Sequence, residues 1–151
     1  MKTTVITLIL TALLAASVGA HCQIPCGIYD DTARITEMKE HVTTIEKSMN
    51  EITKLSAETP QNSNQLVRWV NNKEAHADKL TDIVTYYFLA QRIKPDTDNY
   101  DAKLKTLHGM MIAAMKSKQT VDLEQVEKLR ALIAEFETLY FDKAASTPHT
   151  H

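Results

Sequence analysis

Apolar side chains recur every three or four residues along most of this chain, and this spacing restricts it to helices. In the stretch after Tyr29 the recurring residues are Ile35, Met38, Val42, Ile45, Met49, Ile52 and Leu55. No glycine or proline interrupts this stretch before Pro60, and Asp30 or Asp31 can cap its start. The pattern predicts a long amphipathic helix with a narrow apolar stripe, as in a helix bundle.

Three further stretches have the same spacing. The second contains Leu66, Trp69, Val70, Ala77, Leu80, Ile83, Val84, Tyr87 and Phe88; the third contains Tyr100, Leu104, Leu107, Met111 and Met115; the fourth contains Val126, Leu129, Ile133, Phe136 and Tyr140. Pro95 disfavours helical geometry in Lys94, so we expect the second helix to end there. Thr59 and Pro60 form either a plain connection or a Thr cap with proline at the first helical position.

Two local signals refine the third and fourth helices. Gly109 lies inside the third, where glycine costs about 1 kcal/mol relative to alanine, so we expect a close contact with a neighbouring helix there. Asp122, followed three residues later by Gln125, resembles a capping box and predicts the start of the fourth helix.

Four helices with short connections predict an all-α fold, an up-down-up-down four-helix bundle over residues 30–144. Residues 145–151 lack periodicity, and we expect a flexible tail. Only three glycines and four prolines occur among 151 residues, which argues against a β protein with many tight turns. The net charge of −2, without a cluster of Lys or Arg, argues against nucleic-acid binding.

Residues 1–20 differ in composition from the rest of the chain. Lys2 is their only charged residue, residues 5–18 are mostly apolar, and Val18-Gly19-Ala20 supplies the small residues of a cleavage site. This pattern is typical of a signal peptide that signal peptidase removes after Ala20. The alternative, a membrane anchor, requires a longer apolar stretch. We therefore expect export by the Sec route to the periplasm or outside the cell, with no membrane attachment after cleavage.

Both cysteines lie within residues 21–29, whose sequence is His-Cys-Gln-Ile-Pro-Cys-Gly-Ile-Tyr. A disulfide between Cys22 and Cys26 would close a loop too short to stabilise the fold much, because its entropic effect grows with loop length. Cleavage would instead leave His21 with a free amine beside the amide and thiol of Cys22. If the chain reverses at Pro25, the Cys26 thiol completes a plane of two nitrogens and two sulfurs, with the imidazole at an axial position.

This set of donor atoms discriminates between metals. Zinc prefers a tetrahedral site without an ionised amide, whereas tetragonal nitrogen-containing sites favour Ni(II) or Cu(II). Thiolates tend to reduce Cu(II), so nickel fits better, and thiolates with an anionic amide stabilise Ni(III). The residues predict a one-electron redox catalyst for a small substrate. Two alternatives remain open: an exported nickel or copper carrier without turnover, and a secreted helical bundle with a disulfide.

The pattern His-Cys-x-x-Pro-Cys-Gly-x-Tyr at a processed N-terminus resembles the nickel-binding hook of the nickel-containing superoxide dismutases. Its fixed residues are all present, as His21, Cys22, Pro25, Cys26, Gly27 and Tyr29. The resemblance implies conversion of superoxide to O2 and H2O2 by a Ni(II)/Ni(III) cycle at this hook, which precedes a four-helix bundle. It implies nickel ligation by the amine and imidazole of His21, the amide nitrogen and thiolate of Cys22 and the thiolate of Cys26. Tyr29 would stand beside the open face, and the protein would form a homohexamer.

The resemblance also implies outer partners for the axial imidazole, a glutamate early in the first helix and a basic residue in the second. Glu37 and His76 are the candidates. We expect His41 and His108, which adjoin apolar stripes, to be structural helix histidines. Gln23 stands where some relatives carry an acid, so we expect no essential role for its side chain. Four aromatic residues are expected in the core or at a subunit contact: Trp69, Tyr86, Tyr87 and Phe88, of which either tyrosine could approach the hook.

Overall fold

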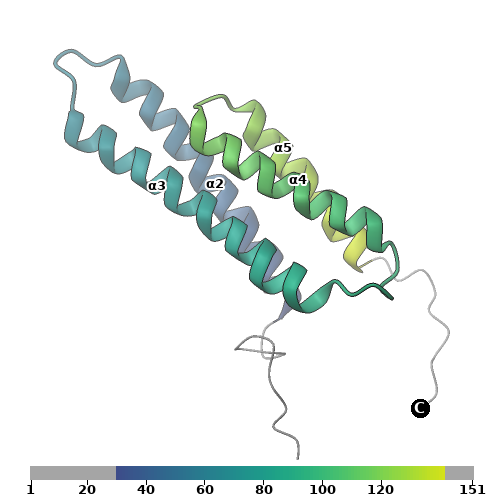
Figure 1. The fold of residues 1–151 in the computed structure, drawn as a ribbon. Helices are drawn as coiled ribbons and strands as arrows, with labels where there is room; N and C mark the ends of the chain where they lie inside the picture. The colour runs from purple at the N-terminus through teal and green to yellow at the C-terminus, as the bar shows by residue number, and fades with distance from the viewer. Residues whose placement is uncertain (1–29, 142–151) are drawn as a thin grey trace, which may run out of the picture.

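The computed structural model describes residues 30–141, which form four helical rods (Figure 1). They are α2 (Asp31–Ser56), α3 (Ser63–Asp82) continued directly by the π-helix η1 (Ile83–Arg92), α4 (Tyr100–Gln119) and α5 (Glu124–Phe141). Each rod contacts the next along the chain, and α2 also contacts α5, which closes the bundle. The all-α up-down-up-down bundle expected from the sequence is confirmed. The expected signal peptide, hook and tail lie outside the described residues.

Side-chain caps fix the starts of the first two rods. Asp30 caps α2, because its carboxylate accepts a hydrogen bond from the amide of Thr32 at 2.8 Å. Asn62 caps α3 by accepting from the amide of Gln65 at 3.3 Å. Thr59 therefore lies in the connection, and its alternative assignment as the cap of the second helix is wrong.

The start of α5 differs from the expected capping box. The carboxylate of Asp122 accepts a hydrogen bond from the amide of Glu124, the first residue of α5, at 2.9 Å. Gln125 is the second residue of α5, and the amide of Asp122, which a capping box would pair with the Gln125 side chain, donates instead to the hydroxyl of Thr120 at 3.0 Å. The buried Oε1 of Gln125 has no hydrogen-bond partner among residues 30–141. Asp122 helps to begin the helix, but the reciprocal bond of a capping box is absent from this part of the chain.

The core is apolar and runs the length of the bundle, but parts of two stripes were placed wrongly from the sequence. On α4, Met115 is 46% exposed and the buried methionine is Met110. On α3, Val70 is 37% exposed. The buried face of α4 consists largely of small or polar residues, which apolar periodicity does not count: Lys103, Thr106, Ala113, Ala114 and Ser117. No helix between residues 30 and 141 is both long enough and apolar enough to cross a membrane.

A close contact holds α4 against α5 at Gly109. A Cβ atom at this position would lie 3.2 Å from Cδ2 of Leu132. The absence of a side chain therefore lets the two helices approach, as expected from a glycine in a helix interior.

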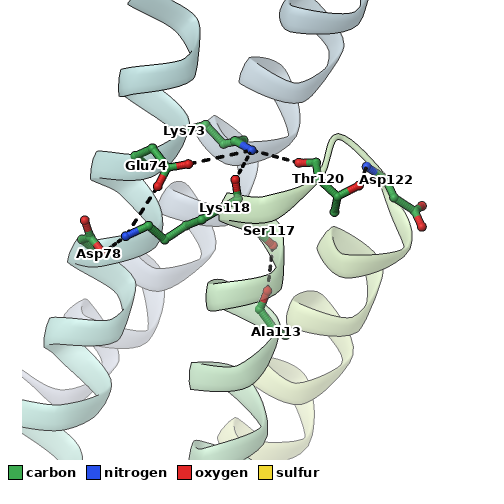
Figure 2. Close-up of polar contacts among 8 residues, drawn as sticks. All are labelled: Lys73, Glu74, Asp78, Ala113, Ser117, Lys118, Thr120 and Asp122. Atoms are coloured by element: carbon green, nitrogen blue, oxygen red, sulfur yellow. Dashed lines mark hydrogen bonds and ion pairs between the residues drawn. The ribbon is translucent and has the colours of Figure 1, made fainter.

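A buried lysine joins the two halves of the bundle. Lys73 of α3 is only 4% exposed, and its ammonium group donates to the carbonyls of Lys118 at 2.7 Å and Thr120 at 2.9 Å (Figure 2). These carbonyls lie at the C-terminal end of α4, where the helix has no backbone donors left to satisfy them. Lys118 in turn pairs with Asp78 of α3 at 2.7 Å. Lys73 thus caps α4 from a neighbouring helix.

The π-helix η1 was not expected from the sequence, which suggested one continuous α-helix. Its ten residues end in a wide turn, which is closed by the next residue: the amide of Ile93 donates to the carbonyl of Phe88 at 3.0 Å, five residues earlier. In such a turn, side chains five positions apart lie on the same face of the helix. Tyr87 and Arg92 have this spacing, and the guanidinium carbon of Arg92 lies 4.8 Å from the centre of the Tyr87 ring.

Candidate metal centre

The expected ligands His21, Cys22 and Cys26, together with Tyr29, lie outside the described residues. Their roles stay predictions. The structure does describe the part of the bundle to which residues 21–29 are joined, because α2 begins at Asp31. The start of α2, the end of η1 and the end of α5 lie at one end of the bundle (Figure 1).

Asp31 is the centre of a hydrogen-bonded cluster at this end. Its Oδ1 accepts from Nε of Arg92 at 2.9 Å and from the hydroxyl of Tyr87. Its Oδ2 accepts from the hydroxyl of Tyr140 at 2.8 Å. Arg92 also donates to the Tyr87 hydroxyl at 3.1 Å. One carboxylate therefore joins the first residue of α2 to η1 and to the last turn of α5.

The charges of this cluster are well matched. Burial alone would raise the pKa of Asp31, but the hydrogen bonds from its three partners outweigh burial and hold the pKa below the ordinary 3.8. Burial and the bond to Asp31 raise the pKa of Tyr87 and of Tyr140. The cluster therefore holds an ionised carboxylate between protonated tyrosines at neutral pH.

Sequence reasoning did not find this cluster. From the sequence, Asp31 was expected only as a possible cap and Tyr87 in the core or at a subunit contact, and no role was expected for Arg92. The structure also separates the two adjacent tyrosines, because Tyr86 is 54% exposed whereas Tyr87 is 6% exposed and faces Asp31. The η1 geometry that brings Tyr87 and Arg92 together leaves no signal in apolar periodicity.

A second polar group lies further along α2 and connects the two expected outer partners. Oε1 of Glu37 is 3.9 Å from Nε2 of His41, and Nδ1 of His41 is 3.1 Å from Nδ1 of His76. The two imidazole rings meet edge to face, with centroids 4.9 Å apart. Glu37 and His76 therefore belong to one group, and His41 connects them. His108 lies apart from them, exposed on α4.

His41, which was expected only as a structural helix histidine, is the central residue of this group. It is 8% exposed, and its Nε2 has no hydrogen-bond partner among the described residues. Burial lowers the pKa of His41, and His76 lowers it further; burial also lowers the pKa of His76. Both rings are therefore neutral at neutral pH. Arg34 forms an ion pair with the other carboxylate oxygen of Glu37. The spacing of four residues between Glu37 and His41 was the available signal.

Comparison with known proteins identifies the family to which this helical scaffold belongs. A family model described as nickel-containing superoxide dismutase matches residues 16–144. The chain belongs to the nickel-containing superoxide dismutase family. It is an oxidoreductase that contains nickel and acts on superoxide. Neither the curated proteins nor the solved structures give a match.

The donor groups available in residues 21–29 fit the chemistry of nickel. Among residues 30–141 no group of three or more His, Cys, Asp or Glu side chains could hold a metal ion. Cys22 and Cys26, the two cysteines of the chain, precede that range, and both lie within the matched residues 16–144. Thiolate and imidazole donors are ligands that nickel accepts, and residues 21–29 supply both.

Proposed function

We propose that the mature protein is an exported superoxide dismutase whose nickel is held by an N-terminal hook, residues 21–29. The amine and imidazole of His21, the amide nitrogen and thiolate of Cys22 and the thiolate of Cys26 would be the ligands. The observation that carries the proposal is the family match over residues 16–144, which includes both cysteines and this histidine. The overall reaction converts two superoxide ions and two protons into one O2 and one H2O2.

When bound by residues 21–29, nickel would supply a one-electron Ni(II)/Ni(III) couple for this reaction. The chain's own residues control access and orientation. Tyr29 would stand beside the metal site and order water or control the access of small anions. Glu37 and His76 would support the axial His21 imidazole, since a metal-bound imidazole usually donates its second N–H to an outer acceptor.

The length of the connecting chain supports this assignment of Glu37. Glu37 lies six residues after Asp31 on α2, a rise of about 9 Å along the helix axis. Nine residues can span roughly 30 Å when extended, so residues 21–29 are long enough to fold back over this part of α2. Asp31, fixed by Tyr87, Tyr140 and Arg92, would provide a rigid point from which they start.

Maturation and assembly complete the proposal. Residues 1–20 would be a signal peptide removed after Ala20, so that His21 becomes the N-terminus of an exported protein, in the periplasm or outside the cell. Residues 30–144 would form the bundle and residues 145–151 a tail. The bundle would assemble as a homohexamer, as the family resemblance implies.

The deciding experiment combines metal analysis with electron paramagnetic resonance on the mature protein, residues 21–151. The expected result is about one nickel per chain and a rhombic Ni(III) signal split by an axial nitrogen. Cys22→Ser and Cys26→Ser should each abolish the signal and the activity while helicity is kept. Gln23→Ala, a change in the same segment at a side chain without a proposed ligand role, is the matched control and should retain both.

The two alternative functions predict different results. A carrier would release nickel or copper readily, give no Ni(III) signal and show no turnover. A disulfide-bonded bundle would contain no free thiols and no metal. Retention of activity in both cysteine variants would refute the hook.

A further inference from the structure

Three side chains form a continuous row across the interface between α2 and α3. Glu37 and His41 lie one turn apart on α2, with 3.9 Å between Oε1 and Nε2. His41 then contacts His76 of α3 through the two Nδ1 atoms, 3.1 Å apart. His41 is the buried middle member, whereas Glu37 and His76 are both half-buried. The outer members can therefore meet another group, but His41 can act only through them.

The contact between the two Nδ1 atoms requires one ring to donate and the other to accept. A neutral imidazole carries one N–H, so the choice at Nδ1 also decides the state of Nε2 in each ring. If His41 donated, its buried Nε2 would present a lone pair toward the carboxylate of Glu37, and two acceptors would face each other. If His76 donates, the N–H of His41 lies at Nε2, the atom that is 3.9 Å from that carboxylate. Electrostatics favours the second arrangement.

We propose that His41 is a positioning residue that holds His76 as the Nδ1–H tautomer, so that Nε2 of His76 is a fixed hydrogen-bond acceptor. This inference rests on the proposed function for its purpose: the acceptor would receive the free N–H of the metal-bound His21 imidazole. In a neutral histidine, the hydrogen bond made by one ring nitrogen decides whether the other nitrogen is a donor or an acceptor. Glu37 acts at the far end of the row by fixing the tautomer of His41.

The proposal explains why a histidine can support a metal-bound imidazole at this position. A histidine without a partner can rotate and exchange tautomers, so that it presents a donor and an acceptor in turn. His41 removes that freedom, because its Nδ1 accepts only from a His76 ring that carries its proton at Nδ1. The role of His76 thus depends on His41, a buried residue for which no contact with His21 is proposed.

The first test reads the tautomer directly and does not depend on activity. Nitrogen-15 side-chain spectra of the mature protein, residues 21–151, in the reduced state should show His76 as the Nδ1–H form. His41→Asn places an amide oxygen near the original Nδ1 and should preserve this form. His41→Leu should shift His76 toward the Nε2–H form that free histidine favours. His108→Asn, at an exposed histidine of α4, is the matched control and should change nothing. An Nε2–H form of His76 in the unsubstituted protein would overturn the proposal.

The second test asks whether this tautomer matters at the nickel. His41→Leu should change the axial nitrogen splitting of the Ni(III) signal and lower kcat about tenfold with little change in KM. His41→Asn should restore most of both. An unaltered splitting in a folded His41→Leu protein would overturn the link to His21. Failure of the proposed function would be visible separately, as an unsubstituted protein without nickel or turnover, and the nitrogen spectra would still decide the state of the histidine pair.

Discussion

The hydroxyl of Tyr140 donates a hydrogen bond to the carboxylate of Asp31 at 2.8 Å, although the two residues are 109 positions apart. The bond joins the first turn of α2 to the last turn of α5. Tyr87 and Arg92 of η1 bind the same carboxylate. Three rods are therefore held together at the end of the bundle where residues 21–29 join it.

Removal of the Tyr140 hydroxyl should destabilise the bundle measurably. Tyr140→Phe deletes a donor to a charged acceptor, and we expect the free energy of unfolding to fall by about 1–2 kcal/mol. Denaturant unfolding followed by circular dichroism measures this change. Tyr86→Phe removes a hydroxyl from a side chain that is 54% exposed, and it should have almost no effect. Equal stabilities of the two variants would contradict the importance of the Asp31 bond.

The stability of the protein should depend on Asp31 in acid. Because the pKa of Asp31 is below the ordinary 3.8 in the folded state, folding favours the carboxylate over the acid. Its contribution is complete above the ordinary value and is lost as the pH falls through the lower folded value. The difference in unfolding free energy between the unsubstituted protein and Asp31→Asn should shrink between about pH 5 and about pH 2. A difference that is constant over this range would show that the carboxylate is not preferentially stabilised.

Lys73 should be essential to the end of α4. Lys73→Met keeps the length of the side chain but leaves the carbonyls of Lys118 and Thr120 without their buried donor. We expect a loss of about 2 kcal/mol in unfolding free energy, together with faster amide hydrogen exchange in the last turn of α4. Lys128→Met, at an exposed position of α5, is the control and should be close to neutral. Exchange rates in α4 that match those of the control would refute the capping role.

A free amine at His21 should be indispensable if the hook is correct. One extra residue ahead of His21 moves the amine away from the metal plane while leaving both thiols in place. We expect loss of the normal Ni(III) signal and of turnover, measured on purified protein with nickel supplied. The same residue added after His151 tests for a general effect of lengthening the chain and should be harmless. Full turnover from the N-terminal extension would mean that the amine is not a ligand.

The helices and their order could be predicted because they depend on local information. Apolar residues at spacings of three and four, with few glycines and prolines, located the four rods and the cap at Asp30; the second rod ends at Arg92, two residues before the expected Lys94. The ligand pattern of residues 21–29 was equally local, and it led to the family that the comparison then identified. Patterns within short stretches of sequence were therefore sufficient to predict the helices and to recognise the family.

What could not be predicted depends on which faces of different helices meet. The pair of His41 and His76 requires the register of α2 against α3, and neither residue indicates the other in the sequence. From the sequence, Lys73 would be expected at the surface, because its buried hydrogen bonds depend on the position of α4 beside α3. On α4, small and polar residues fill the buried face, so counting apolar residues displaced the stripe toward Met115.

The wide turn of η1 makes the winding of this segment as important as the identity of its residues. Tyr87 and Arg92 reach the same carboxylate because five positions separate them where the backbone turns through five residues. In ordinary α-helical winding of about 100° per residue, the same five positions would place Arg92 roughly 140° around the helix axis from Tyr87. A return of this segment to α-helical winding, with no side chain changed, would therefore separate Tyr87 from Arg92 and break up the cluster at Asp31.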